Sequence, residues 1–331
     1  VGSEMCIRDR VRERYGKAPQ PSTEKVGTLS KEWAEKLGLK ESIVISGSSF
    51  DAHAGAVGAG IAEKTFVCTM GTSCVDMFVE KAENLKGKNI QSYCGQAENS
   101  ILPGYVGVET GQAAFGDIFA WFKRLLEWPL NQLSQIRESD ISEELYIKVK
   151  DQILLMLQEE AERLPDEPFP VALDWFNGRR YPNTDDAQKS AIVGLSLGMD
   201  APYLYRSLVF GAVCGLYRLI EGFEKQQINI EKIIAVGGIS KKSPYVMQML
   251  SDLSNREICI LDSDQTCAQG AAMYAAVAAG IYENLETAAG YMAAKCIKTY
   301  KPNSEKKEWY RKHYQEYLNL AEAVNTLNVF E

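Results

Sequence analysis

The sequence has 331 residues, 46% of them apolar, and its 36 Lys and Arg against 44 Asp and Glu give a net charge of −8 at pH 7. This length allows a sizeable core and about two domains. The acidic balance, with no run rich in lysine or arginine, argues against nucleic acid as a partner. No apolar run reaches the roughly 18 residues of a membrane-spanning helix, so we expect no membrane insertion.

The first half of the chain contains recognisable helix and strand patterns. We expect, in chain order, a helix at 29–39 with Ser30 as its cap, a strand at 43–46, strands at 65–70 and 74–79, a looser segment at about 80–107, and a helix at 111–126 that ends before Pro129. The two strands flank Gly71-Thr72-Ser73 in the manner of a hairpin.

The second half shows a cleaner alternation. We expect, in chain order, a helix at 142–164, a segment at 169–180 that begins as a strand and ends in a turn, a strand at 191–197, a helix at 202–226, a strand at 232–236, a helix at 244–253, a strand at 257–261, a helix at 266–279 and a terminal helix at 302–324. Strands that alternate with helices predict an α/β domain.

Asp51 is the first candidate for chemistry. It follows the predicted strand at 43–46, and ligands in α/β domains meet the sheet where strands end. A carboxylate in that place can act as a general base. The spacing equally allows Asp51 to cap a helical turn at 52–57, and both interpretations stay open.

Two glycine-containing turns are candidates for phosphate contact. Gly71, Thr72 and Ser73 present backbone N–H groups and two hydroxyls, although an ordinary hairpin turn explains them as well. Gly237 and Gly238 end the predicted strand at 232–236, where glycines allow either close approach of a nucleotide or a turn with positive φ. The chain contains no G-x-x-x-x-G-K-[ST] sequence, which excludes a P-loop enzyme.

Charged and cysteine residues complete the candidates. Glu109, expected just before a helix, can accept hydrogen bonds from sugar hydroxyls or stabilise the helix dipole. Lys241 and Lys242 can lie near phosphates or form a solvated loop pair. Two histidines exclude a histidine-rich metal site, and the eight cysteines, mostly in apolar segments, are expected to be reduced thiols of a cytoplasmic protein.

Six segments in order resemble the FGGY family of carbohydrate kinases, from about Val26 to the end of the chain. They are FDAHAGAVGAG (50–60), GTS (71–73), CGQAENSILPGYVGVETGQAAFGDIFAWF (94–122), LDWFNGRR (173–180), AVGGISKKSPYVMQ (235–248) and DQTCAQGAAMYAAVAAG (264–280). The GQAAFGDIFAWF and LDWFNGRR segments favour members that act on L-ribulose over those that act on xylulose or glycerol.

The resemblance implies an actin-like α/β sugar-kinase fold of two ribonuclease-H-like domains, with ATP and sugar in the cleft between them. Residues 41–331 would be an essentially complete C-terminal ATP-binding domain, and 11–40 the remnant of a mostly missing N-terminal domain or an inter-domain link. The family's first phosphate loop, of Asp-x-Gly-Thr type, has no match here. Residues 1–10 resemble translated sequencing-adaptor sequence, and we expect them to be non-native.

The same resemblance implies a role for each candidate residue. Asp51 would bind the sugar and take the proton from the 5-hydroxyl of L-ribulose in L-arabinose catabolism, and Glu109 would also bind the sugar. The nucleotide contacts would come from Gly71, Thr72, Ser73, Gly111, Gly237, Gly238 and Ser243, the last where the family often has Asn. ATP and Mg²⁺ would be the cofactors, with no metal ligand assigned in this chain, and a homodimer stays open.

Two other functions stay open. The first is another FGGY kinase, acting on xylulose or a related ketose or polyol. The second is a non-catalytic, actin-like nucleotide-binding protein, which would bind ATP without sugar-dependent turnover.

Overall fold

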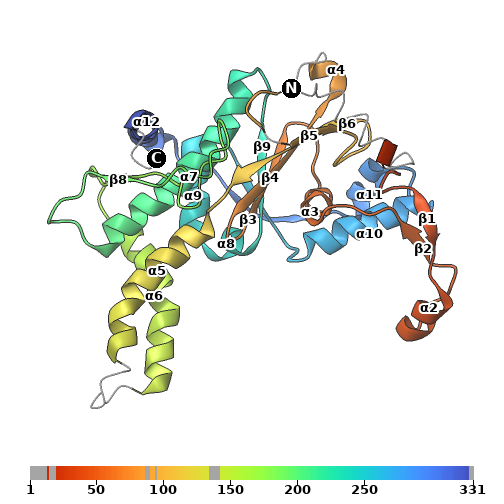
Figure 1. Cartoon of the computed structure of the whole chain (residues 1–331), viewed down its shortest axis with the longest axis horizontal. Coiled ribbons are helices and arrows are strands. Elements are labelled where there is room, and N and C mark those ends of the chain that lie inside the picture. Colours follow the sequence, from red (N-terminus) through yellow and green to blue (C-terminus); the bar gives the residue numbers. More distant parts are fainter. Residues whose placement is uncertain (1–12, 15–19, 86–89, 94, 134–141, 328–331) are drawn as a thin grey trace.

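A seven-stranded sheet forms the centre of the computed structural model, which describes residues 13–14, 20–85, 90–93, 95–133 and 142–327 (Figure 1). The strand order is β11-β10-β9-β3-β4-β6-β5. β9 is parallel to its neighbours β3 and β10, and the other pairs are antiparallel. The strands are β3 (Thr65–Met70), β4 (Cys74–Lys81), β5 (Gly95–Glu98), β6 (Tyr105–Gln112), β9 (Lys232–Val236), β10 (Ile258–Leu261) and β11 (Cys296–Tyr300).

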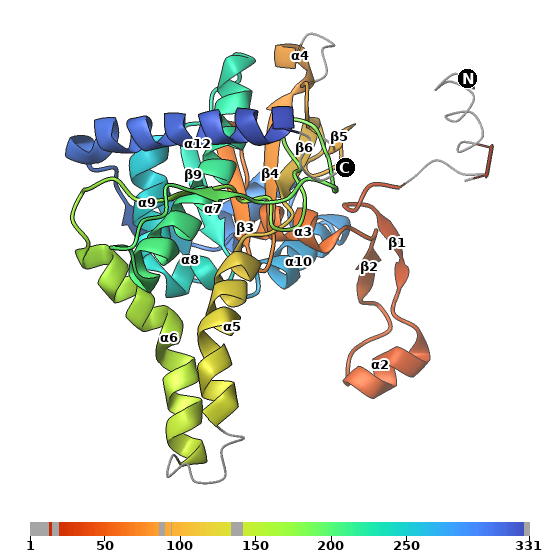
Figure 2. The same cartoon turned by 60° about the vertical axis from the view of Figure 1, so that its left-hand side comes forward.

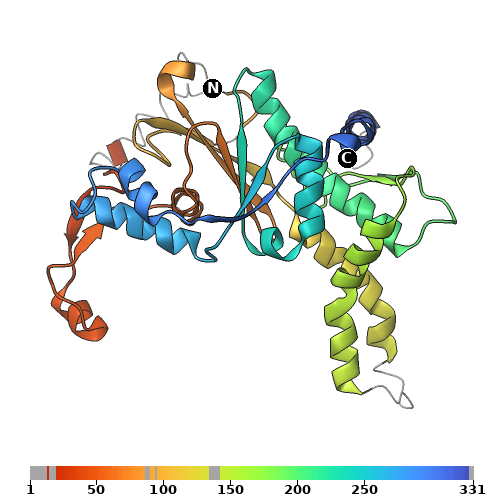
Figure 3. The ribbon, with the colours of Figure 1, turned by 180° about the vertical axis from the view of Figure 1, so that it is seen from behind.

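Helices cover both faces of this sheet because side chains alternate along its strands. In β3, Phe66 and Cys68 belong to one buried cluster and Val67 to the other. The first cluster is completed by α5 (Gly116–Leu133), α6 (Glu143–Arg163), α7 (Ala201–Lys225), α9 (Pro244–Ser254) and α12 (Lys307–Leu327). The second is completed by α3 (Asp51–Gly58), α10 (Thr266–Ala278) and α11 (Leu285–Met292). Figure 3 shows from behind that α12 and the α10–α11 pair lie on opposite sides of the sheet.

Smaller elements surround this body. The α5–α6 pair projects away from the sheet, and the two-stranded sheet of β1 (Lys25–Thr28) and β2 (Val44–Ser46) stands at one side with α2 (Lys31–Leu37) (Figure 2). The remaining elements are α4 (Ala82–Leu85), β7 (Val171–Ala172), β8 (Ile192–Val193), α8 (Gly238–Lys242) and the 3-10 turn η1 (Ser304–Lys306). In the described part of the chain, no helix combines the length and apolar character needed to cross a bilayer.

Most of the predicted elements are confirmed, including the hairpin at Gly71-Thr72-Ser73 and the alternation from β9 to α10. The prediction for 80–126 is partly wrong, because β6 occupies Tyr105–Gln112 and the helix starts only at Gly116. Pro129 lies inside α5 and does not end it. It sits in the projecting part of the helix, where water can replace the hydrogen bond that proline cannot make.

The cysteine prediction is wrong at one pair. Cys259 of β10 and Cys296 of β11 form a disulfide between neighbouring strands. Cys68, Cys74 and Cys214 are free and buried, as expected. Residues 1–10 and Cys94 lie outside the described residues, so those predictions stay untested.

The pair of helices on the second face packs at backbone contact. A Cβ added to Gly58 of α3 would collide with the carbonyl of Thr266, and one added to Gly270 of α10 would collide with the carbonyl of Ala54. Only glycine allows the two helices to approach so closely. This contact fixes the position of α3, and with it the position of Asp51 at its first turn.

We predict that Gly270→Ala lowers the free energy of unfolding by about 1–3 kcal/mol, because the methyl group overpacks a backbone contact. Gly290→Ala is the matched control: Gly290 lies exposed in α11 with no atom within 4 Å of an added Cβ. Its replacement should stabilise the helix by about 0.5–1 kcal/mol. Urea unfolding followed by circular dichroism measures both, and equal stabilities for the two variants would contradict the packing argument.

Candidate functional site

The turn between β3 and β4 is held by the first residues of α5. The carbonyl of Gly71 accepts a hydrogen bond from the N–H of Gly116 (3.1 Å), and that of Thr72 accepts from Phe115 (2.8 Å) and Asp117 (3.1 Å). The N–H of Gly71 donates to the carbonyl of Ser73 within the turn (2.9 Å). The Gly71 amide is therefore already used, and a phosphate contact in this turn depends on its other amides and the two hydroxyls.

Two glycines let the chain close around this turn. A Cβ on Gly116 would lie 2.5 Å from the Gly71 carbonyl oxygen, and one on Gly237 would lie 2.5 Å from that of Met70. Gly237 also has φ 94°, so the interpretation of a turn with positive φ is confirmed there. Gly238 differs, because a Cβ on it would meet no atom within 4 Å. Gly238 therefore faces open space, whereas Gly237 is tightly packed.

Beside the turn lies a cavity of about 500 Å³, which we call the turn cavity. It brings together four of the residues predicted from the sequence, Gly71, Thr72, Gly238 and Ser243. Its other lining residues are Met70, Gly116, Asp117, Phe119, Ala120, Asp151, Leu154, Leu155, Gln158, Tyr205, Ile239 and Lys242. The predicted residues Asp51, Ser73, Glu109, Gly111 and Gly237 are not part of this lining.

Ser243 links two helices in the wall of the turn cavity. Its hydroxyl donates to Oε1 of Gln158 (2.7 Å) and accepts from the N–H of Val246 (3.3 Å). It thereby caps α9 and ties it to α6. Of the lysine pair, Lys242 lines the cavity, whereas Lys241 pairs with Asp264.

The α6 side of the turn cavity was not predicted from the sequence. Asp151 and Gln158 come from α6, far along the chain from the turn, and Asp117 from the start of α5. Only the acidic character of Asp117 and Asp151 could have marked them as ligands for a cation. Mg²⁺ in nucleotide sites is held by one or two carboxylates together with substrate phosphates, so these two side chains fit that ion.

Asp51 is the first residue of α3 and is exposed; the cap position belongs to Phe50. Oδ1 of Asp51 accepts a hydrogen bond from the N–H of Ala52 (2.8 Å). The cap interpretation is therefore wrong by one position, although the carboxylate still lies at the helix start. One oxygen of this carboxylate, Oδ1, is bound to the start of the helix. The other oxygen, Oδ2, is the one that could meet a ligand.

Glu109 lies beside the same helix, at the middle of β6. The expectation of a place just before a helix is wrong, because Glu109 pairs with Met77 of β4 in the sheet. Its Oε2 lies 3.4 Å from Nε2 of His53, which is two residues after Asp51 on α3. The edge of Phe50 packs on the His53 ring at 5.3 Å. The structure therefore places His53 of α3 beside Glu109 on the second face of the sheet, with Asp51 two residues earlier on the same helix.

Gly111 has a packing role in the sheet. A Cβ on it would collide with the carbonyl of Cys74, on the neighbouring strand β4. It lines a separate small cavity with Gln112 and Asp174. Its predicted nucleotide contact stays a prediction.

The chain matches one family model over most of its folded part. The model is that of the C-terminal domain of the FGGY family of carbohydrate kinases, and it matches residues 66–279. The chain belongs to this family. Its central sheet with helices on both faces is the C-terminal domain of an FGGY sugar kinase.

Named relatives and solved structures agree with this assignment. The chain is 39% identical to a ribulokinase of Vibrio parahaemolyticus over 324 residues, which cover 97% of the chain and 57% of the relative. It is 35% identical to a ribulokinase of Halalkalibacterium halodurans over 306 residues, 91% of the chain and 52% of the relative. The chain thus spans about half the length of the curated relatives it matches.

Solved structures support the fold alone, because their sequence identities are low. The xylulose kinase of Rhodospirillum rubrum has a TM-score of 0.74 at 18% identity and covers 93% of this chain and 57% of its own. The glycerol kinase of Plasmodium falciparum, solved with ADP, has a TM-score of 0.67 at 16% identity and covers 91% of this chain and 55% of its own.

In this FGGY domain a buried carboxylate, that of Asp76, lies on β4 close to the β3–β4 turn. Asp76 of β4 is fully buried, and its Oδ1 accepts from the thiol of Cys74 (3.2 Å), the residue that follows the turn. Its Oδ2 has no hydrogen-bond partner among the described residues. Burial raises the pKa of Asp76 from 3.8 to about 7, against the opposing effect of the cysteine thiols. The fold therefore favours the protonated acid.

We predict that Asp76→Asn becomes more stable relative to the native chain as pH rises from about 4 to 8. The native fold holds a proton on Asp76 up to pH about 7, whereas the unfolded chain loses it near pH 4. The free energy of unfolding of the native chain therefore falls as pH rises from about 4 to about 7, by an amount on the order of 4 kcal/mol. The variant has no carboxyl at this position and does not show this decrease.

Urea unfolding at several pH values measures this difference. Glu35→Gln, at an exposed position of α2, is the control and should show no such trend. A difference between Asp76→Asn and the native chain that stays constant from pH 4 to 8 would contradict a raised pKa.

Proposed function

We propose that this chain forms the ATP-binding half of a ribulokinase, which transfers the γ-phosphoryl group of ATP to the 5-hydroxyl of L-ribulose. The observation that carries the proposal is the turn cavity, whose walls contain four predicted nucleotide contacts, in a chain 39% identical to a ribulokinase. We place the reaction in the cytoplasm, because ATP is its phosphoryl donor. As a ribulokinase reaction it would belong to L-arabinose catabolism.

The turn cavity suits a nucleotide with a bound Mg²⁺. Its volume of about 500 Å³ lies in the range of small-molecule pockets. Apolar side chains such as Phe119 and Leu155 can hold the base, while the Thr72 hydroxyl and the Lys242 ammonium can meet phosphate oxygens. Asp117 and Asp151 would hold Mg²⁺, which would neutralise charge on the phosphates.

Asp51 and Glu109 suit a sugar. Asp51 is exposed and keeps one carboxylate oxygen beyond its bond to Ala52, so it can accept the proton of a hydroxyl that attacks phosphorus. Glu109, which contacts His53 of the same helix, can accept hydrogen bonds from other sugar hydroxyls. In this proposal the alcohol is activated on the α3 side and the triphosphate enters from the turn.

We predict that Gly238→Leu abolishes nucleotide binding without unfolding the chain. A Cβ at this position meets no protein atom within 4 Å, and Gly238 lines the turn cavity, so we expect a larger side chain there to occupy part of it. Calorimetric titration of residues 1–331 with ATP and Mg²⁺ should lose at least about tenfold in affinity. Gly290→Leu, at an equally open position of α11, should bind as the native chain does. Native affinity in Gly238→Leu would place the nucleotide elsewhere.

We predict that Asp51→Asn lowers kcat by about 10²–10⁴, the usual contribution of a general base, while the Kd for ATP stays unchanged. The assay is coupled ADP release with L-ribulose, in a fusion that places residues 26–331 after the N-terminal half of the V. parahaemolyticus ribulokinase. Residues 11–331 alone should turn over little.

Glu98→Gln, at an exposed site of β5, is the control for this variant and should keep native kcat. An active Asp51→Asn enzyme would remove Asp51 from the base role. D-xylulose in place of L-ribulose tests the substrate, and a higher kcat/KM with D-xylulose would reassign the chain within the family.

A further inference from the structure

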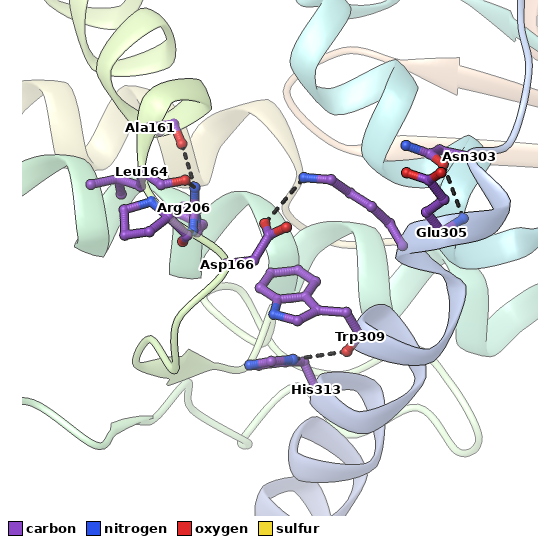
Figure 4. A network of polar contacts seen from close by, with 10 residues as sticks. Ala161, Leu164, Asp166, Arg206, Asn303, Glu305, Trp309 and His313 are labelled. Atoms are coloured by element: carbon purple, nitrogen blue, oxygen red, sulfur yellow. Dashed lines mark hydrogen bonds and ion pairs between the residues drawn. The ribbon is translucent and has the colours of Figure 1, made fainter.

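A second cavity, of about 340 Å³, lies against the same helices as the turn cavity, and we call it the aromatic cavity. Helices α6 and α7 contribute to both, through neighbouring positions such as Tyr205 for the turn cavity and Arg206 for the aromatic cavity. Helix α9 lines the aromatic cavity, and its cap Ser243 lines the turn cavity. Its other side is closed by the end of β11, η1 and the start of α12 (Figure 4). Its lining consists of Glu162, Asp166, Arg206, Pro244, Tyr245, Gln248, Met249, Asp252, Tyr300, Asn303, Lys306, Trp309 and Tyr310.

The guanidinium of this cavity is already bound by the protein. Arg206 is only 5% exposed, and Figure 4 shows it directed at the end of α6. Its Nη1 donates to the carbonyl of Pro165 and its Nη2 to those of Ala161 and Leu164, each at 2.7 Å. Arg206 thus satisfies the last carbonyls of α6 and neutralises the negative end of the helix dipole. Little of its charge is left for a ligand.

The ammonium of the cavity is likewise paired. Lys306 donates to Oδ1 of Asp166 (3.1 Å), which joins η1 to the chain after α6 (Figure 4). Glu162, by contrast, forms no ion pair with a lysine or arginine in the described residues. Burial, followed by the nearby Glu159, raises the pKa of Glu162. One carboxylate of the cavity thus forms no ion pair, although the neighbouring Arg163 opposes the rise of its pKa.

Asp252 is the second carboxylate that forms no ion pair with a lysine or arginine in the described residues, and it is 3% exposed. Nε2 of Gln248 (2.8 Å) and the N–H of Asn303 (2.7 Å) both donate to its Oδ1. These are its hydrogen bonds in the described part of the chain, so Oδ2 is the oxygen that remains for a ligand. Burial raises the pKa of Asp252, while these bonds and the nearby Lys306 ammonium oppose the rise. A cation that enters the cavity would relieve the cost of burying this charge.

The remaining walls are aromatic. Tyr245, Tyr300, Trp309 and Tyr310 line the cavity, and Trp309 stands beside Asp166 in Figure 4. Aromatic faces attract organic cations and pack against alkyl chains. They supply no ligands for a bare metal ion, and within the described residues no three His, Cys, Asp or Glu side chains come close enough to hold one. The combination favours a cation that carries an apolar body.

We propose that the aromatic cavity binds a small organic ammonium ion, with its charged nitrogen at Asp252 and Glu162 and its alkyl chain against the aromatic walls. The occupant is an aliphatic amine or diamine, which matches a cavity with two carboxylates that form no ion pair in the described residues. The proposal goes beyond the proposed kinase function and does not depend on it.

The test is calorimetric titration of residues 1–331 with 1,5-diaminopentane, in buffer of physiological ionic strength without nucleotide. We expect saturable binding of one diamine per chain and none of 1,5-pentanediol, which has the same length without charge. Asp252→Asn should weaken binding at least about tenfold, the effect of 1.4 kcal/mol or more. Glu162→Gln, at an exposed position, should weaken it several-fold.

Glu160→Gln is the matched control, since Glu160 is exposed on the same helix but does not line the cavity. It should bind the diamine as the native chain does. Equal binding of the diol would show a site for neutral polyols, and overturn the proposal. Absent or unsaturable diamine binding, or native affinity in both Glu162→Gln and a folded Asp252→Asn, would also overturn it.

Discussion

The turn cavity exists because the turn between β3 and β4 is clamped from two sides. The start of α5 donates three N–H groups to the carbonyls of Gly71 and Thr72, and the strand β9 ends against Met70 through Gly237. Neither contact tolerates a Cβ, so the backbone itself sets the distance between the turn, α5 and α8. A displaced turn would either fill the cavity or open it to solvent.

The alternation of side chains across the sheet then separates the two halves of the site. Val108 enters the cluster under α7 and α12, and its neighbour Glu109 is directed to the opposite face, where α3 lies. Gln112 pairs with Cys74 at the turn, so Glu109 lies three residues, about 10 Å, along β6 from it. One short strand therefore contributes to both faces of the sheet, with Glu109 on the α3 side and Gln112 beside the end of the β3–β4 turn.

How much of the fold and of the site could be predicted from the sequence depended on how far apart in the chain the interacting residues are. The β9-to-α10 alternation is local and was visible, because each strand is a short apolar run and each helix begins near a proline or threonine. The strand β6 was missed because its glycines look like turn residues. Gly107 is needed instead because a Cβ would collide with Ser100, and Gly111 because it would collide with Cys74.

Features that join distant segments gave no signal in the sequence. The Cys259–Cys296 disulfide spans 37 residues, and the α6 wall of the turn cavity depends on the contact of Gln158 with Ser243, 85 residues away. The resemblance to the family named Ser243 as a nucleotide contact, and the structure adds that it caps α9. The cap role uses the short side chain of Ser243 at the edge of the cavity.

The two segments that made the resemblance most specific meet inside the protein and not at the substrate side. Gln112 of one donates through Nε2 to Oδ2 of Asp174 in the other (2.7 Å), and Tyr317 of α12 donates to Oδ1 (2.7 Å). Gly215 completes the site, because a Cβ there would collide with the Asp174 carboxylate. A buried carboxylate is tolerated only while its partners stay in place, so these residues depend on one another. Such a network identifies a fold more strongly than a sugar, because every one of its contacts is made inside the protein.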